Sequence, residues 1–277
     1  MIIKMEKYRF DKKEHLHELF VEGEWKPLTG TTTIIEILGK VLTWWASGMA
    51  CQTMGWIKPE RDPKNWQKVL NQKEREKGAE IFFESLKTMS SKDYLYLLDK
   101  AYKAHNENKK ETAQEGTDLH AELEKFVRNG ESAKIDWEDP KISDFVYWTK
   151  NNVKRFLGSE VHCFDEELFV GGICDFVAEL NDNTLAICDF KRSPKAYFNH
   201  FVQMGGYHIQ LERNGAFDEN GKLLFKFEKP VSQYIVFPFG SEKLEPKISI
   251  SLEDYKNSFK NCVSLYRNKE KYENQIL

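Results

Sequence analysis

The chain has 277 residues, 40% of them hydrophobic, and a formal net charge of −3 at pH 7. This length and composition predict a soluble globular protein with a sizeable core, and the near-neutral charge gives no global electrostatic case for nucleic-acid binding. No stretch approaches the roughly 18 apolar residues of a membrane span, and the charged N-terminus does not resemble a signal peptide, so we expect a cytoplasmic protein.

The first part of the chain is predicted to form a hairpin and then a helical lobe. Apolar positions alternate around a Glu22-Gly23-Glu24 turn, and from Thr31 onward they follow a helical spacing. The charged stretch that follows is poor in strand formers, which favours helices. The predicted elements are a hairpin over 8–28, a helix from Thr31, a continuation at Trp44-Trp45-Ala46, and helices over 63–86 and 92–113.

The second part of the chain is predicted to be a sheet covered by helices, which makes the fold α/β (α+β). Gly116 and Thr117 are expected to end one helix and cap the next. The predicted elements are helices over 118–128 and 140–157, strands over 160–170, 173–180 and 184–191, a helix over 197–213, a strand over 231–239 and a helix from Leu252. Gly205-Gly206 falls inside one of these helices, where close approach of another backbone is the expected reason for two glycines.

Four regions follow from this order of elements. They are an N-terminal hairpin (1–30), a helical lobe (31–113), a core (114–240) and a C-terminal helix packed on the core (241–277).

Two strands of the core carry three charged residues in an otherwise apolar setting. Asp189 and Lys191, two apart on one strand, project from the same face. If Asn181-Asp182-Asn183 is a three-residue turn, Asp175 lies opposite Asp189, with Cβ atoms roughly 5 Å apart. A turn that also includes Thr184 would slip the register and turn Asp175 away. We expect the three-residue turn, or an equivalent bulge, with a divalent cation between the two carboxylates to relieve their repulsion.

Residues on either side of this hairpin complete a pattern of four motifs. These are Gly116-Thr117-x-x-His120, Gly172-x-x-Asp175, Asp189-x-Lys191 and Gln203-x-x-x-Tyr207. In this order the motifs resemble the PD-(D/E)XK nuclease superfamily, in particular its RecB-like and phage-type exonuclease branch. The resemblance covers most of residues 25–240 and implies a restriction-endonuclease-like core, a central mixed sheet flanked by helices.

The resemblance also implies a metal centre with one or two Mg²⁺ or Mn²⁺ ions. The implied ligands are His120, Asp175, Asp189 and the backbone carbonyl of Phe190. Lys191 would contact the nucleophilic water and the scissile phosphate. Carboxylate oxygens suit both cations, and a histidine ligand favours Mn²⁺.

The resemblance also implies roles for residues outside the ligand set. Gln203 and Tyr207, one helical turn apart, would face the DNA backbone and the water of the metal site. Arg192 and Ser193 would contact substrate, although many relatives carry threonine where this chain has Arg192. Glu124 would be an outer partner of the metal site.

The function implied is a metal-dependent DNA exonuclease in phage-type recombination, replication or repair, which leaves 5′-phosphates and 3′-hydroxyls. DNA is the expected partner, with a single-strand annealing protein or a helicase beside it, in a bacterial or phage-infected cell. The alternatives are a structure-specific endonuclease on the same core and a non-catalytic DNA-binding scaffold. The five cysteines are scattered without a CxxC pair, so we expect no iron–sulfur cluster.

Overall fold

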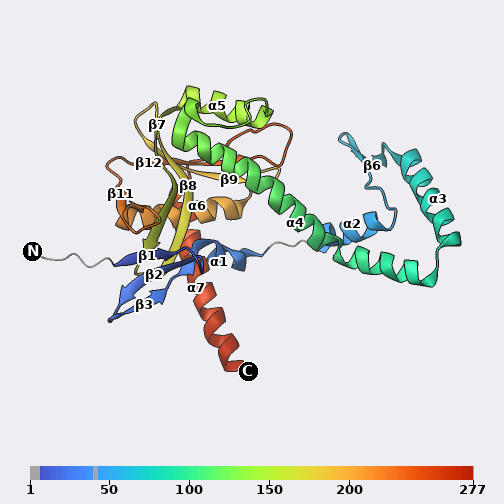
Figure 1. Ribbon diagram of the computed structural model, residues 1–277, viewed down its shortest axis with the longest axis horizontal. Coiled ribbons are helices and arrows are strands. Elements are labelled where there is room, and N and C mark those ends of the chain that lie inside the picture. The colour runs from blue at the N-terminus through green and yellow to red at the C-terminus, as the bar shows by residue number, and fades with distance from the viewer. Residues whose placement is uncertain (1–6, 40–42, 277) are drawn as a thin grey trace, which may run out of the picture. The chain divides into compact units, whose positions relative to one another are not determined.

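The computed structural model describes residues 7–39 and 43–276, and among these it leaves aside the side chains at 43–46, 66, 105–118 and 274–276. The chain divides into two compact units (Figure 1). One comprises Met1–Gly39 and Asp118–Leu277, and the other Lys40–Thr117.

The smaller unit is mainly helical, as predicted for this region, but it also contains a short hairpin. Its elements are α2 (Thr43–Thr53), β5 (Arg61–Asp62), β6 (Asn65–Val69), α3 (Gln72–Thr88) and the first part of α4 (Ser91–Asn129). The predicted helix over 63–86 is therefore wrong at its start. Asp62 accepts a hydrogen bond from the backbone N–H of Lys64, and Asn65 accepts one from Gln67, so these side chains stabilise a turn instead.

Helix α4 runs without a break through Gly116 and Thr117. The predicted helix end and new cap at these two residues are therefore wrong. One glycine inside a helix costs only about 1 kcal/mol relative to alanine, which a helix of 39 residues tolerates. The helix ends at Asn129, as predicted from Asn129-Gly130, and Gly130 has a left-handed φ of +58°.

The N-terminal strands form the predicted hairpin and then lead the chain into the larger sheet. Strands β1 (Tyr8–Asp11), β2 (Leu16–Val21) and β3 (Glu24–Pro27) form an antiparallel sheet of three strands. β4 (Thr29–Gly30) pairs in parallel with β8 (Val170–Leu180). The following helix is shorter than predicted: α1 (Thr31–Ile35) passes into the 3₁₀ turn η1 (Glu36–Leu38), and residues 40–42 of the prediction lie outside the described chain.

The large sheet is mixed, because β9 (Leu185–Lys191) and β12 (Val231–Pro238) are parallel, whereas β8 and β9, the central hairpin, are antiparallel. Its strands are β7 (Val153–Asp165), β8 (Val170–Leu180), β9 (Leu185–Lys191), β10 (Ala216–Phe217), β11 (Leu223–Phe225), β12 (Val231–Pro238) and β13 (Lys247–Ser249), in the order β11-β10-β7-β8-β9-β12-β13. The helix predicted over 140–157 ends at Asn152, and Val153 already pairs with Leu180 of β8. Apolar residues such as Val153 and Phe156 suit a helix face or a strand, and pairing with β8 decides between them.

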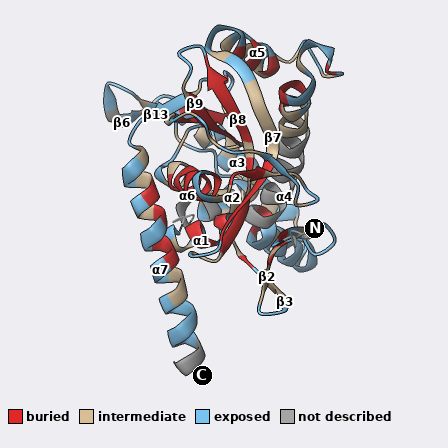
Figure 2. Cartoon of the chain, turned by 90° about the vertical axis from the view of Figure 1, so that its left-hand side faces the viewer, coloured by how far each residue is buried: buried red, intermediate tan, exposed pale blue. Residues whose placement is uncertain are grey.

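Helices cover both faces of this sheet, so the predicted mixed α/β architecture with flanking helices is confirmed (Figure 1). On one face, α5 (Pro140–Asn152) and the end of α4 pack through Phe145 and Phe126 against Phe176 and Phe237. On the other face, α6 (Phe198–Asn214) packs through Met204 and other apolar residues, with α7 (Leu252–Ile276) against α6. Figure 2 shows the buried residues gathered in the strands and in α6.

No helix in the described part of the chain has the length and apolar character needed to cross a membrane.

Candidate metal centre

The central hairpin has the register that a three-residue turn predicts. Leu180 donates its backbone N–H to the carbonyl of Thr184 at 2.9 Å, and the ladder pairs Glu179 with Leu185 and Phe176 with Cys188. In this register the next pair is Asp175 with Asp189, so the two aspartates stand opposite each other. Asp175 Oδ2 also accepts a hydrogen bond from the backbone N–H of Phe190 at 2.6 Å, which ties the carboxylate to the end of β9.

Asp189 and Lys191 form a buried ion pair at the end of β9. Lys191 Nζ lies 2.6 Å from Asp189 Oδ2, and the Asp189 side chain is only 1% exposed. Burial raises the pKa of Asp189 to about 7, although Lys191 acts against this shift. Burial alone would lower the pKa of Lys191, but Asp189 and Asp175 outweigh it and the pKa is raised, so the ammonium group keeps its charge.

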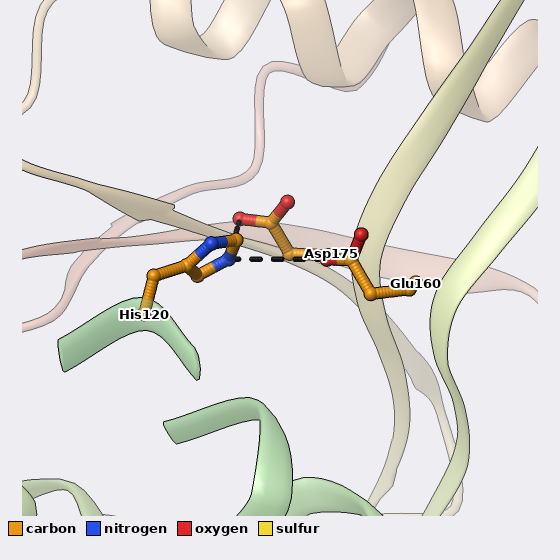
Figure 3. A group of neighbouring side chains, drawn as sticks. All are labelled: His120, Glu160 and Asp175. Atoms are coloured by element: carbon orange, nitrogen blue, oxygen red, sulfur yellow. Dashed lines mark ion pairs between the residues drawn. The ribbon is translucent and has the colours of Figure 1, made fainter. Parts of the chain in front are cut away.

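A second group of side chains converges beside Asp175. His120 on α4, Glu160 on β7 and Asp175 on β8 each offer one ligand atom, and these atoms lie within 4.8 Å of one another (Figure 3). His120 Nε2 is 3.4 Å from Asp175 Oδ2 and 3.9 Å from Glu160 Oε1. The imidazole ring meets the edge of the Phe190 ring at a centroid distance of 5.4 Å, which helps to fix its position.

Glu160 is the member of this group that the sequence analysis missed. Val161 pairs with Cys174 and Ser159 with Phe176, so Glu160 stands opposite Asp175 between two paired positions. Its φ of +49° is left-handed, an uncommon conformation for a residue other than glycine. Had the β7–β8 register been worked out, as the β8–β9 register was, Glu160 would have appeared across from Asp175.

The protonation of the group follows from burial and from the charges around it. Burial, with Asp175 and Glu124 adding to it, raises the pKa of Glu160 to about 7. Burial acts to raise the pKa of Asp175 as well, yet His120 and Lys191 hold it below its ordinary value. For His120 the carboxylates overcome burial, and its pKa is raised. Asp175 therefore stays ionised at lower pH than Glu160 does.

Gln203 and Tyr207 lie one turn apart on α6 and are both buried. Gln203 Nε2 donates to Tyr207 Oη at 2.8 Å and to Thr32 Oγ1 at 3.0 Å, which joins α6 to α1. A Cβ atom at Gly172 would lie 2.7 Å from the Tyr207 ring, so glycine on β8 allows the ring to approach the strand. The two predicted residues thus form one hydrogen-bonded unit beside the β8 strand that carries Asp175.

The remaining predicted residues lie around this centre. Ser193 donates its hydroxyl to the carbonyl of Lys195 at 2.7 Å, and Arg192 beside it is partly exposed. Glu124 lies one helical turn after His120 and forms an ion pair with Arg128 at 2.5 Å. Glu124 also contributes to the raised pKa values of His120 and Glu160, in keeping with a place outside the closest group.

The donor atoms of the site fit a hard divalent cation. Glu160 Oε1, His120 Nε2 and Asp189 Oδ1 are buried and make no hydrogen bond within the described residues. Buried carboxylate oxygens without a donor are costly, and a cation would satisfy them. Two carboxylates and one imidazole suit Mn²⁺ or Mg²⁺. The 4.8 Å group contains His120 and Asp175 of the ligand set implied by the resemblance, and has Glu160 in place of Asp189.

A comparison of the chain with protein-family models finds no match, and a comparison with curated proteins finds none either.

Proposed function

We propose that this chain is a metal-dependent deoxyribonuclease with a restriction-endonuclease-like core, and that it acts as an exonuclease of the RecB-like and phage type. The observation that carries the proposal is the placement of a protonated lysine, two opposed aspartates and a helix-borne histidine around the end of one hairpin. Lys191, Asp189 and Asp175 come from two neighbouring strands, and His120 reaches the same place from α4.

Each residue of the site has a task in phosphodiester hydrolysis. His120 and Asp175 would hold a Mg²⁺ or Mn²⁺ ion, together with Asp189 and the carbonyl of Phe190 as the resemblance implies. A cation so bound would polarise a phosphoryl oxygen and lower the pKa of a bound water. Lys191, kept charged by Asp189, would neutralise the negative charge that grows on the phosphate in the transition state.

The leaving group and products follow from this chemistry. Attack of water on phosphorus with release of the 3′ oxygen leaves a 5′-phosphate and a 3′-hydroxyl. Gln203 and Tyr207 would orient the backbone of the strand at the site, and Arg192 and Ser193 would contact flanking phosphates. The same proposal makes DNA the substrate, and a single-strand annealing protein or a helicase the partner, in a bacterial or phage-infected cell.

The test is digestion of end-labelled linear DNA and of closed circular DNA with Mg²⁺, with Mn²⁺ or with EDTA. We expect release of 5′-phosphorylated products from linear DNA, no cleavage of circles, and complete loss with EDTA. Lys191→Ala should slow cleavage at least 100-fold, on the scale of losing one transition-state contact. Lys195→Ala is the matched control, because Lys195 is exposed four residues further on and should leave the rate unchanged.

Other outcomes would point to the alternatives. Cleavage of circular DNA would favour the endonuclease. A folded protein that binds DNA but cleaves none under any of these conditions would favour the scaffold, and cleavage that persists in EDTA would remove the metal mechanism.

A further inference from the structure

Glu160 stands at a position where the sheet is locally irregular. The β7–β8 ladder pairs the residues on both sides of it, but Glu160 itself takes a left-handed backbone conformation with a φ of +49°. Non-glycine residues held in this region cost on the order of 1 kcal/mol and are found most often where function needs them. The conformation accompanies a side chain that points toward His120 and Asp175 (Figure 3).

One oxygen of the partly exposed Glu160 carboxylate is without a hydrogen-bond donor among the described residues. Its Oε1 is buried and accepts no hydrogen bond in the described part of the chain, and its nearest cationic neighbour is His120 Nε2 at 3.9 Å. The fully buried Asp189 likewise has an Oδ1 atom without a hydrogen bond among the described residues. Two separate carboxylates around Asp175 are therefore incompletely paired, although native structures normally pair such atoms.

Among the described residues, two cationic side chains that act on this group already form ion pairs. Lys191 forms its ion pair with Asp189, and Arg128 forms its ion pair with Glu124. The ligand atoms of Glu160, Asp175 and His120 lie within 4.8 Å of one another, and His120 Nε2 is 3.4 Å from the Asp175 carboxylate and 3.9 Å from the Glu160 carboxylate. A cavity of about 500 Å³ lies on the Glu160 side and provides room for a hydrated ion to enter.

We propose that Glu160 is a direct ligand of the divalent cation, on the same ion as His120 and Asp175. This assignment rests on the nuclease function proposed above and changes its ligand set, because the resemblance places no ligand on β7. These three side chains would leave further positions on the ion for water and for phosphate oxygens, as a hydrolytic site requires.

The experiment measures cation binding without DNA. Mn²⁺ is titrated into the metal-free protein, and the free ion is followed by electron paramagnetic resonance. Glu160→Gln should weaken Mn²⁺ binding at least 10-fold, since even residues outside the coordination shell can change affinity by 10-fold to 100-fold. Glu219→Gln is the matched control: Glu219 lines the same cavity and is exposed in an ion pair with Lys12, so its affinity should stay unchanged.

A second measurement separates a ligand from an indirect partner. Removing a ligand opens a position to water, so bound Mn²⁺ in Glu160→Ala should have one more inner-sphere water and raise the water proton relaxation rate per bound ion. Circular dichroism of both variants should match the wild type. Wild-type affinity in Glu160→Gln would overturn the inference, and so would weaker binding with an unchanged number of waters.

The failure of this inference can be told apart from failure of the nuclease proposal. If Glu160→Gln binds Mn²⁺ normally while the wild type cleaves DNA with Mg²⁺ and not with EDTA, only the role of Glu160 is wrong. If the wild type binds no Mn²⁺ and cleaves no DNA, the proposed function itself is wrong, and the role of Glu160 is wrong with it.

Discussion

Gly205 in α6 lies against the backbone of α7, and replacing it with alanine tests whether this contact fixes the two helices. A Cβ atom at position 205 would lie 2.6 Å from the carbonyl carbon and oxygen of Tyr255 and 2.8 Å from the amide nitrogen of Lys256. Ordinary contacts between such atoms are about 3.5–4 Å. Because the obstacle is backbone, α6 and α7 would have to separate by about 1 Å for the methyl group to fit.

The expected cost follows from two opposing effects. Overpacking of a filled core typically destabilises by about 1–3 kcal/mol, and a clash with backbone belongs at the upper end of that range. Alanine in place of glycine inside a helix stabilises by about 1 kcal/mol. We therefore expect Gly205→Ala to lower the free energy of unfolding by about 2 kcal/mol.

Urea unfolding followed by circular dichroism at 222 nm measures this change. Gly206→Ala is a graded comparison, because its Cβ would meet the Phe259 ring, which can move, and the loss should be smaller. Gly48→Ala in α2 is the control for helix propensity alone, since its nearest neighbour would be 4.0 Å away, and it should not destabilise. A Gly205→Ala protein as stable as the wild type would refute the close contact between α6 and α7.

Three further variants test other parts of the molecule. Burial lowers the pKa of His17 to about 3, so between pH 6.5 and pH 3 only the unfolded chain takes up this proton, and stability falls as the pH is lowered. The loss between pH 7 and pH 5 should be on the order of 2 kcal/mol. It should be smaller in His17→Gln when urea unfolding is compared at the two pH values. Leu123→Ala should cost about 2–5 kcal/mol in urea unfolding and weaken Mn²⁺ binding, because Leu123 is fully buried one turn after His120. Thr32→Val removes the hydroxyl that Gln203 donates to, at a cost of about 1 kcal/mol, and should lower kcat for DNA cleavage a few-fold with little change in KM.

The parts of the fold that the sequence predicts well are those governed by short-range rules. A three-residue turn sets the register of a hairpin, so the alignment of Asp175 with Asp189 follows from counting along the chain and is confirmed by the pairing around it. The close approach of another backbone, predicted for Gly205-Gly206, is confirmed at Gly205, where α7 backbone lies against the helix. At Gly206 the close neighbour is the Phe259 side chain.

The parts that the sequence predicts poorly are those where two local rules give different answers. Residues 61–69 carry charges typical of a helix surface, yet Asp62 and Asn65 accept hydrogen bonds from the backbone and stabilise a turn between two short strands. Val153 suits a helix or a strand equally, and only the partner strand β8, 27 residues further along, decides the outcome. Long-range pairing of this kind has no local pattern.

The residues of the candidate site also differ in how well the sequence predicts them. Four of its residues stand in short motifs, and those motifs draw attention to His120, Asp175, Asp189 and Lys191. Glu160 belongs to no motif. Its position depends on the pairing of β7 with β8, and the predicted strand over 160–170 is wrong at residues 166–169, which form the turn between these two strands. A carboxylate that comes from a neighbouring strand in this way is found only by comparing the strand pairing on both sides of a known site residue.

The same comparison explains why Asp175 is the centre of the arrangement: it stands opposite Glu160 on one side and in register with Asp189 on the other. If Glu160 is a ligand, the metal centre extends from β7 across β8 to the end of β9, where Asp189 also holds Lys191 in place through its ion pair.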